Sequence, residues 1–149
     1  MDIYDYLKMD HDKVARLFKQ FNKTEINVRK QQIMEWIAQE LLVHAKSEQD
    51  TFYKALLSHS LSKEDALHGK KEHKEIVDQI HSIMNSKDHG ASWVKKVEKL
   101  QEIVEHHVKE EEHALFKEAK KVLSEEEAYV LKEHMHYLKQ DLLKTQKPK

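Results

Sequence analysis

Cysteine, proline and glycine are almost missing from this chain of 149 residues, which contains no cysteine, one proline and two glycines. Without cysteine the protein has no disulfide, no thiol nucleophile and no thiolate ligand for a structural zinc site or an iron–sulfur cluster. The single proline, Pro148, lies at the C-terminal tail, so it does not interrupt the long segments rich in Lys, Glu, Leu, Gln and Ala. No segment alternates apolar and polar residues in the manner of a strand. The sequence therefore predicts an all-α fold.

Arginine and long apolar runs are scarce as well. Only Arg16 and Arg29 are arginines among the 26 basic residues, and the formal net charge is −1. Lysine and glutamate are interspersed, which is typical of solvated helix surfaces, whereas nucleic-acid-binding proteins usually gather basic residues on one face. No apolar run has the length of a transmembrane helix, and the N-terminus lacks the apolar core of a signal peptide. We therefore expect a cytoplasmic protein that binds neither nucleic acid nor membrane.

Apolar residues recur at helical spacing in five segments that short polar linkers separate. Four long helices with short connections pack as an up-down-up-down four-helix bundle. We predict this bundle over residues 3–122 of one domain, 1–149, with an additional C-terminal helix at about 125–144 and a frayed tail at 145–149. The bundle helices are expected at about residues 2–22, 25–58, 62–85 and 91–122.

Local signals refine the expected helix ends. The Ser62–Asp65 and Ser124–Glu127 pairs resemble capping boxes. Asp10 is a candidate cap for a helix whose first turn holds His11. Gly69 costs roughly 1 kcal/mol relative to alanine inside a helix, so it predicts a kink or a later helix start in the third segment.

Histidine, by contrast, is abundant, with 12 residues spread over every helical segment. In the fourth segment a histidine and a glutamate four residues apart lie within a hydrophobic repeat. The repeat has the spacing of one helix face and consists of Val97, Leu100, Val104, His107, Glu111 and Ala114. A carboxylate on a buried face is costly unless something pairs with it. His106 and Glu110 have the same spacing one residue earlier, but His107 and Glu111 continue the apolar face.

The second segment repeats this pattern with His44 and Glu48, and the first and third segments each carry one histidine, His11 and His73. A single histidine on an apolar face is more often a hydrogen-bonded core residue, and a single His-x-x-x-Glu pair is more often exposed. Four histidines and two glutamates on the inward faces of one bundle instead favour a shared metal site. Nitrogen and oxygen donors without thiolates suit iron, manganese or zinc.

The remaining histidines are predicted to be solvated on other faces or in loops, although His81 lies eight residues after His73 and could approach the bundle. They are His59, His68, His81, His89, His113, His134 and His136.

These motifs resemble those of the hemerythrin-like, or HHE cation-binding, family over roughly residues 3–122. The resemblance rests on Asp10-His11, on His44-x-x-x-Glu48 followed by Phe52-Tyr53, on Glu72-His73, and on His107-x-x-x-Glu111-Glu112-His113-Ala114-Leu115-Phe116. It implies a four-helix bundle that holds two non-haem iron ions, with both carboxylates bridging the irons beside an oxo or hydroxo bridge. Zinc and manganese are alternative metals. The implied ligands are His11, His44, Glu48, His73, His107 and Glu111.

One departure from the family concerns the third segment. Oxygen-carrying members have a second histidine one turn after the histidine that corresponds to His73, and this chain has Val77 there. Two coordination positions on the pair of irons are then left open, unless water or one of the side chains Tyr53, Glu112 and His81 fills one of them. The shortfall is also compatible with a mononuclear site or with a different metal. In addition, the chain has no cysteine-containing N-terminal segment, which lowers the expectation of a role in iron-centre repair.

Three functions are compatible with these features. The leading hypothesis is a di-iron protein that binds or senses O2, peroxide or nitric oxide, with apolar neighbours such as Phe18, Ile37, Val104 and Leu115 keeping the pocket dry. The second is a peroxide-decomposing, catalase-like enzyme. The coordination positions left open because residue 77 is valine suggest this hypothesis. The third is an iron-responsive bundle without catalytic activity. The residues favour a protein that binds a metal and a small ligand over a dedicated enzyme, and they identify no protein partner.

Overall fold

The computed structural model describes residues 1–146, which contain helices and no strand. The predicted tail therefore lies partly outside the described residues, at 147–149. The last helix extends to Gln146, two residues beyond the predicted end. In chain order the elements are α1 (Ile3–Lys23), α2 (Asn27–Glu48), η1 (Gln49–Tyr53), α3 (Lys54–Leu57), α4 (Ser60–Met84), α5 (Ala91–Glu110), η2 (Glu111–Leu115), α6 (Phe116–Val122) and α7 (Glu125–Gln146).

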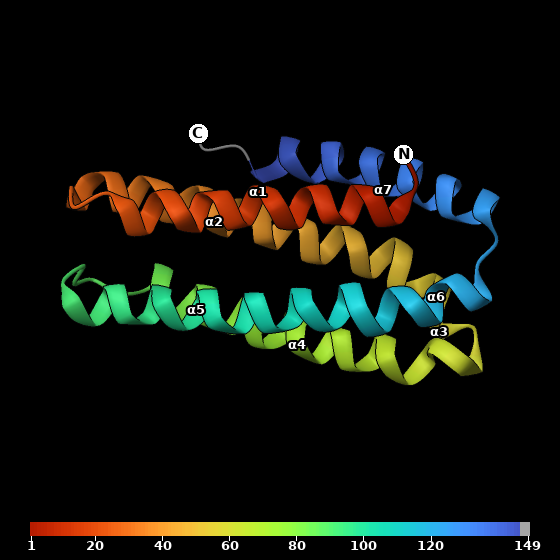
Figure 1. Cartoon of the computed structure of the whole chain (residues 1–149). Coiled ribbons are helices and arrows are strands. Elements are labelled where there is room, and N and C mark those ends of the chain that lie inside the picture. Colours follow the sequence, from red (N-terminus) through yellow and green to blue (C-terminus); the bar gives the residue numbers. More distant parts are fainter. Residues whose placement is uncertain (147–149) are drawn as a thin grey trace.

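Four long helical rods lie side by side along the long axis of the molecule and alternate in direction, which is the up-down-up-down bundle that the sequence predicted (Figure 1). The first and third are α1 and α4, and the second and fourth are the continuous runs α2–η1–α3 and α5–η2–α6. α1 packs against α2, α4 packs against α5, and α7 lies along α1, α2 and η1 on the outside of the bundle. Within the described residues, none of the helices is long and apolar enough to span a membrane.

The helix ends follow the capping signals in part. The Ser124–Glu127 box is confirmed, because the Ser124 hydroxyl accepts from the Glu127 amide and the Glu127 carboxylate accepts from the Ser124 amide. The Ser62 box is wrong: α4 begins two residues earlier, and the buried Ser62 hydroxyl donates to the carbonyl of Leu56 at 2.8 Å. Asp10 does not cap a helix either, since it is buried in the middle of α1.

Two π-helical turns interrupt the second and fourth rods beside the glutamates of the two His-x-x-x-Glu motifs. η1 begins directly after Glu48, and η2 begins at Glu111. A π turn takes an extra residue, so the side chains that follow it rotate to a different face. Ala114, predicted on the buried face, is consequently exposed, and Leu115 is buried in its place. Apolar periodicity alone does not predict this shift.

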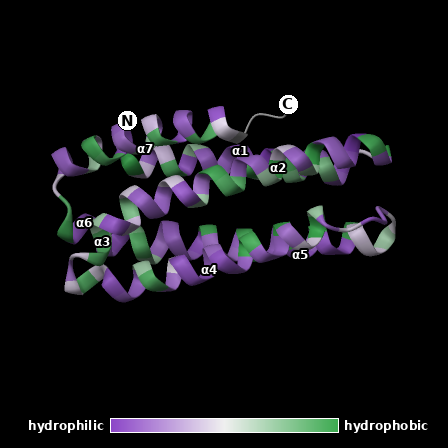
Figure 2. Ribbon diagram, turned by 180° about the vertical axis from the view of Figure 1, so that it is seen from behind, coloured by the Kyte–Doolittle hydropathy of each residue, from purple (hydrophilic) through white to green (hydrophobic). Residues whose placement is uncertain are grey.

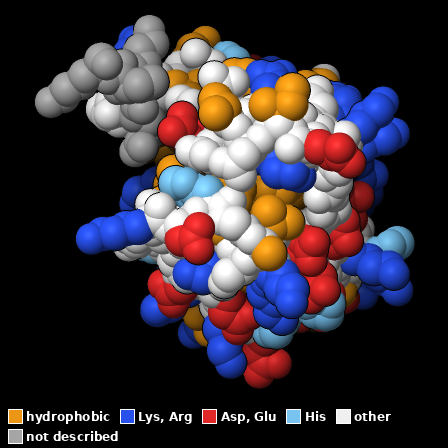
Figure 3. Space-filling view, turned by 90° about the vertical axis from the view of Figure 1, so that its left-hand side faces the viewer, with side chains coloured by type: hydrophobic (Ala, Val, Ile, Leu, Met, Phe, Trp, Pro, Cys, Tyr) orange, Lys and Arg blue, Asp and Glu red, His pale blue; other side chains and the backbone are white. Residues whose placement is uncertain are grey.

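The buried apolar side chains form two separate clusters. The cluster toward the α1–α2 and α4–α5 connections includes Phe18, Ile37 and Val104. The cluster toward the N-terminus and α7 includes Phe52 and Leu115. Figure 2 shows hydrophobic and hydrophilic residues alternating around the helices, as expected for rods with one buried face. Acidic and basic side chains are interspersed on the end of the molecule shown in Figure 3, in line with the predicted solvated surface.

Candidate metal centre

The six predicted site residues meet between the two apolar clusters. His11 comes from α1, His44 and Glu48 from α2, His73 from α4, and His107 and Glu111 from the junction of α5 and η2. All six are buried, with at most 7% of each residue exposed. The alternative register is excluded, because the side chains of His106 and Glu110 are 65% and 41% exposed. Glu111 therefore faces the core, as its apolar neighbours predicted.

The two glutamates each lie between two histidines. One oxygen of Glu48, Oε1, is 3.2 Å from Nε2 of both His44 and His73. The two oxygens of Glu111 diverge: Oε1 is 3.2 Å from His11 Nε2, and Oε2 is 3.2 Å from His107 Nε2.

The imidazole rings form two pairs. The ring centroids of His11 and His44 are 5.2 Å apart, and those of His73 and His107 are 4.7 Å apart. Each glutamate thus lies between one member of the first pair and one member of the second. This arrangement has the donors for two ions, each near two imidazoles and both near the same two carboxylates.

The outer nitrogen of every one of these imidazoles has a hydrogen-bond partner. Nδ1 of His44 lies 2.8 Å from Asp10 Oδ2, and Nδ1 of His107 lies 2.7 Å from Glu72 Oε1. When Nδ1 donates, the lone pair of the neutral ring is on Nε2, directed at the centre. The remaining two partners accept in the same way, Glu112 from His11 at 2.7 Å and Gln49 from His73 at 3.0 Å.

Sequence reasoning did not predict that these four residues hold the site histidines: it offered Asp10 as a helix cap and Glu112 as a possible ligand, and it gave Gln49 and Glu72 no role. Asp10 and Glu72 directly precede a site histidine, and they are part of the motifs that carry the family resemblance. However, Asp10 binds His44 and Glu72 binds His107, both on another helix. An acidic residue beside a histidine is therefore a usable signal for a partner, but the pairing depends on how the helices are rotated in the bundle.

The inward-facing atoms fit metal ions. Within residues 1–146, no hydrogen-bond partner is found for His11 Nε2, His44 Nε2, either oxygen of Glu48, or Glu111 Oε1. The nitrogen and oxygen atoms lie 3.2 Å apart but lack hydrogen-bond geometry, as expected for donors directed at a common point. Buried carboxylate oxygens without partners cost several kcal/mol each. Cations at these points would remove that cost, and the donor set of imidazole and carboxylate suits iron, manganese or zinc.

When no metal is bound, protons on the site histidines can offset part of the negative charge of the buried carboxylates Glu48 and Glu111. Burial lowers the pKa of His44, but Glu48 and Asp10 outweigh burial and raise it to about 10. Burial likewise lowers the pKa of His107, and Glu111 and Glu72 raise it to about 10. Burial lowers the pKa of His11 too, but Glu111 and Glu112 raise it, so protons on these rings would offset the charge of the two buried carboxylates. His73 differs, since burial lowers its pKa despite the nearby Glu48.

Tyr53 is an additional polar group at the centre. It is completely buried, and its hydroxyl donates to Glu111 Oε2 and lies 3.4 Å from Nε2 of both His73 and His107. Burial, followed by the charges of Glu111 and Glu48, raises the pKa of this hydroxyl well above its usual value. The hydroxyl is adjacent to the His73–His107 pair and makes no hydrogen bond to either imidazole of the other pair among the described residues.

Of the side chains considered for the position opened by Val77, Tyr53 alone lies near the inward-facing Nε2 atoms of the site histidines. His81 is exposed, as predicted for a solvated residue. Glu112 bonds to the outer nitrogen of His11, so it acts from outside the centre. Val77 itself is partly buried.

Gly69 permits the position of Tyr53. α4 passes through Gly69 without a break, so the predicted kink or late start is wrong. A Cβ atom at residue 69 would lie 2.7 Å from the Tyr53 hydroxyl oxygen and 2.8 Å from its ring carbon Cζ. These separations are shorter than van der Waals contact, so only glycine lets α4 approach the phenol this closely.

We expect Gly69→Ala to destabilise the protein by about 1–3 kcal/mol, because overpacking against a buried ring exceeds the roughly 1 kcal/mol gain in helix propensity. Urea unfolding of the purified chain measures the difference. The exposed neighbour Lys70 provides a control, and Lys70→Ala should change the unfolding free energy by less than about 0.5 kcal/mol. A Gly69→Ala variant as stable as the wild type would contradict the proposed close contact.

α7 also contributes to the centre. Lys139, whose side chain is 11% exposed, lies with Nζ 2.6 Å from Asp10 Oδ1, and the other oxygen of Asp10 accepts from His44. Burial raises the pKa of Asp10, but His44 and Lys139 together lower it to about 2. The additional helix therefore supplies a cation that fixes Asp10 as an ionised partner of His44.

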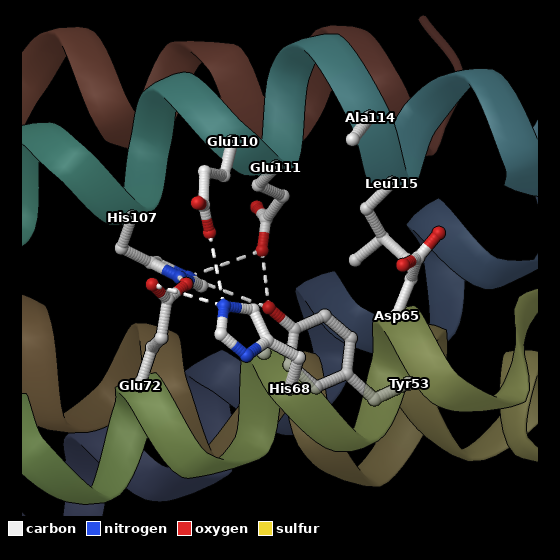
Figure 4. Close-up of a pocket in the computed structure, with 10 residues that line it drawn as sticks. Tyr53, Asp65, His68, Glu72, His107, Glu110, Glu111, Ala114 and Leu115 are labelled. Atoms are coloured by element: carbon white, nitrogen blue, oxygen red, sulfur yellow. Dashed lines mark hydrogen bonds and ion pairs between the residues drawn. The ribbon is translucent and has the colours of Figure 1, made fainter.

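Two of the cavities that adjoin the centre differ in the chemistry of their walls. The first, of about 20 Å³, has an almost wholly apolar surface and is lined by the site histidines together with Val14, Leu41, Ile76, Val104 and Val108. The second, of about 240 Å³, lies on the Tyr53 side and is bordered by polar residues (Figure 4). Its lining includes His107 and Glu111 from the centre and His68, Glu72 and Glu110 nearer the surface.

Comparison with known proteins agrees with this architecture. The family model of the Hemerythrin HHE cation binding domain matches residues 2–119. A crystal structure of a Hemerythrin HHE cation binding domain-containing protein from Mycobacterium kansasii superposes with a TM-score of 0.84, covering 97% of this chain and 89% of that chain at 19% sequence identity. A protein named DNA nickase from Nostoc sp. is 29% identical over 129 residues, which are 85% of this chain and 36% of that protein.

Proposed function

Because this chain belongs to the hemerythrin HHE cation-binding family, and because its buried donors form two half-sites, we propose that it is a non-haem di-iron protein that binds or senses a small oxygen- or nitrogen-containing molecule. The observation that carries the proposal is the pair of glutamates, each lying 3.2 Å from one imidazole of each pair. His11 and His44 would hold one ion, and His73 and His107 the other. Glu48 and Glu111 would be shared.

The side chains around these ligands fix their orientation and charge. Asp10, Gln49, Glu72 and Glu112 each hold one imidazole by its outer nitrogen, so the rings present Nε2 without rearrangement. Iron in such a site supplies a redox-active cation with positions that exogenous molecules can occupy. Tyr53 would occupy or border a position of the ion at His73 and His107, where the family's additional histidine is replaced by Val77.

The apolar cavity supports O2 or nitric oxide as the ligand. Its volume of about 20 Å³ is close to that of a single small molecule, so only a guest of very few atoms fits. Val14, Leu41 and Val104 offer no hydrogen bond to a polar guest. A diatomic molecule loses little hydration on entering such a cavity, whereas peroxide would lose its hydrogen bonds to water.

Metal analysis with spectroscopy tests this function. We expect the chain loaded anaerobically with ferrous iron to hold about two ions and, after oxidation, to give the Mössbauer spectrum of a magnetically coupled pair. Nitric oxide should then change the absorption spectrum of the reduced protein. A chain that holds no more than one iron at saturation would refute the di-iron form, and a reduced di-iron chain indifferent to O2 and nitric oxide would refute the ligand-binding role.

Peroxide decomposition is the second candidate, and the polar cavity favours it. This cavity reaches both Tyr53 and Glu111, and its volume of about 240 Å³ accommodates several water molecules. Tyr53, bonded to Glu111, could hold a proton beside the ion at His73 and His107. Peroxide, which needs hydrogen-bond partners, suits this side of the centre better than the apolar side.

Val77→His separates the two candidates. The new imidazole would restore the family's additional histidine and fill one open position, so O2 release from added peroxide should fall by about tenfold or more. An oxygen electrode measures the release, with free ferrous iron as the blank and Val28→His, at an exposed position of α2, as the control. Wild-type turnover no faster than free iron would eliminate the enzymatic candidate.

A further inference from the structure

A second histidine–carboxylate cluster lies at the mouth of the polar cavity, between α4 and α5. His68 Nε2 is 3.1 Å from Glu110 Oε2 and 3.4 Å from Glu72 Oε2. His106 approaches the same two carboxylates, with Nε2 3.2 Å from Glu110 Oε1 and 3.5 Å from Glu72 Oε2. Figure 4 shows the carboxylates of Glu72 and Glu110 directed at the ring of His68. The sequence predicted His68 to be solvated and assigned no role to Glu72.

The spacing of these atoms would suit ligands around one ion, and His68 Nε2 and Glu110 Oε2 also form a hydrogen bond with each other. Donors about 2.1 Å from a transition-metal ion are about 3.0 Å apart at a right angle and about 3.4 Å apart at the tetrahedral angle. The two distances from His68 to the carboxylates, 3.1 and 3.4 Å, match these values. The ligand atoms of His68, Glu72 and Glu110 all lie within 4.8 Å of one another.

The cluster is linked to the buried centre in two ways. Glu72 belongs to both, since Oε2 faces His68 while Oε1 accepts from the outer nitrogen of His107. The cavity of about 240 Å³ is lined by the cluster at one end and by His107, Glu111 and Tyr53 at the other. At this inner end, Oε2 of Glu111 accepts from Tyr53, whereas Oε1 lies toward His11 and has no hydrogen-bond partner in the described part of the chain.

The exposed fraction of the side chains falls from the surface cluster to the buried centre, as expected for a route of metal uptake. The side chains of His68 and Glu110 are 57% and 41% exposed, Glu72 is 11% exposed, and Glu111 is fully buried. The carboxylates of Glu72, Glu110 and Asp65 line the cavity without a lysine or arginine among its lining residues. An ion entering here passes from exchangeable ligands to buried ones.

We propose that His68, Glu72 and Glu110 form an entry site that binds a divalent first-row transition-metal ion, such as ferrous iron, before its transfer through the polar cavity to the buried centre. The binding at the entry site stands on its own residues, while the transfer step rests on the proposed di-iron function. Imidazole and carboxylate donors suit this class of ion, and exposed ligands permit rapid exchange. An ordinary surface ion pair would instead contribute little and hold no metal.

Cobalt(II) is the probe for binding, since its visible absorption reports coordination by nitrogen and oxygen donors. In a Glu111→Gln chain, with the buried centre disabled, we expect one weakly bound cobalt ion. Adding His68→Asn should weaken this binding by at least about tenfold, whereas adding His81→Asn, at an exposed histidine of the same helix, should leave it unchanged. Cobalt binding that does not respond to His68→Asn would overturn the entry site.

The rate of iron uptake tests the transfer. Metal-free wild-type chain, His68→Asn and His81→Asn are mixed anaerobically with ferrous iron, and bound iron is measured over time. We expect His68→Asn to slow uptake by about tenfold with an unchanged final iron content, and equal rates in all three chains would overturn the transfer role. If wild type takes up no iron but still binds cobalt through His68, the proposed di-iron function fails and the entry site stands.

Discussion

Replacing Glu111 with glutamine is expected to reduce the iron content from about two ions per chain to fewer than one. Both oxygens of Glu111 are directed at site imidazoles, one at His11 and the other at His107, so this carboxylate serves both half-sites. Glutamine keeps the shape of the side chain but removes its negative charge, and losing one ligand shared by two ions weakens both by more than about 100-fold. Atomic absorption of the chain after loading and desalting measures the loss.

Glu98→Gln is the matched control for this experiment. Glu98 is an exposed residue of α5, the helix that continues into η2 at Glu111, so the substitution makes the same chemical change away from the centre. The control should retain about two irons per chain. An equal iron content in both variants would mean that Glu111 is not a ligand, whereas an equal loss in both would point to an effect of net charge rather than of the site.

Removing the metal should lower the melting temperature of the wild-type chain by at least about 10 °C. The six buried polar side chains have no other compensation of equal strength, and metal binding of this kind contributes to folding directly. For a chain of this size, about 1 kcal/mol changes the melting temperature by roughly 2–4 °C. Circular dichroism at 222 nm before and after chelation gives the comparison. The Glu111→Gln chain, which lacks the metal already, should not respond to the chelator.

The metal-free chain should also lose stability as the pH rises from about 6.5 to about 10. His44 and His107 have a pKa of about 10 in the folded chain and about 6.5 when unfolded, so the stability they contribute is complete below the lower value and is lost through the upper one. His73, whose pKa is lowered, acts only at lower pH. Melting temperatures at pH 7 and 9.5 measure the effect. Iron-loaded chain, with neutral imidazole ligands, should show a smaller change.

The sequence predicts the bundle and the six residues of the buried centre because both follow from helical periodicity. His107 and Glu111 could be distinguished from His106 and Glu110 only by their apolar neighbours, and the burial of Glu111 agrees with that choice. Periodicity allows either Ile37 or Trp36 on the buried face of the second segment, and the structure buries Ile37 and exposes Trp36. Whether the buried cluster holds iron, and how many ions, stays a prediction.

The sequence did not predict the contacts between helices or the two π turns. Contacts between helices depend on how one helix is rotated against another, which periodicity within one helix does not reveal. Asp10 and Lys139 are 129 residues apart, and their contact arises because α7 lies along α1. The π turns after Glu48 and at Glu111 are likewise not encoded by a local breaker, since neither glycine nor proline is present there. The second of them, η2, shifts Ala114 outward and Leu115 inward, and both π turns begin where the two helices supply their carboxylates.

The six buried site residues form a polar layer between the two apolar clusters, and this layer affects how cooperatively the protein unfolds. On every rod the site residues separate one cluster from the other: His11 lies between Leu7 and Val14, and His73 lies between Ala66 and Ile76. A protein melts as one unit when its cores are coupled, and here the coupling passes through the layer and the helix backbones. Ions that tie four helices together at that level would make the two halves a single folding unit. Without them, the amide protons of each half are free to exchange through separate openings of different free energy.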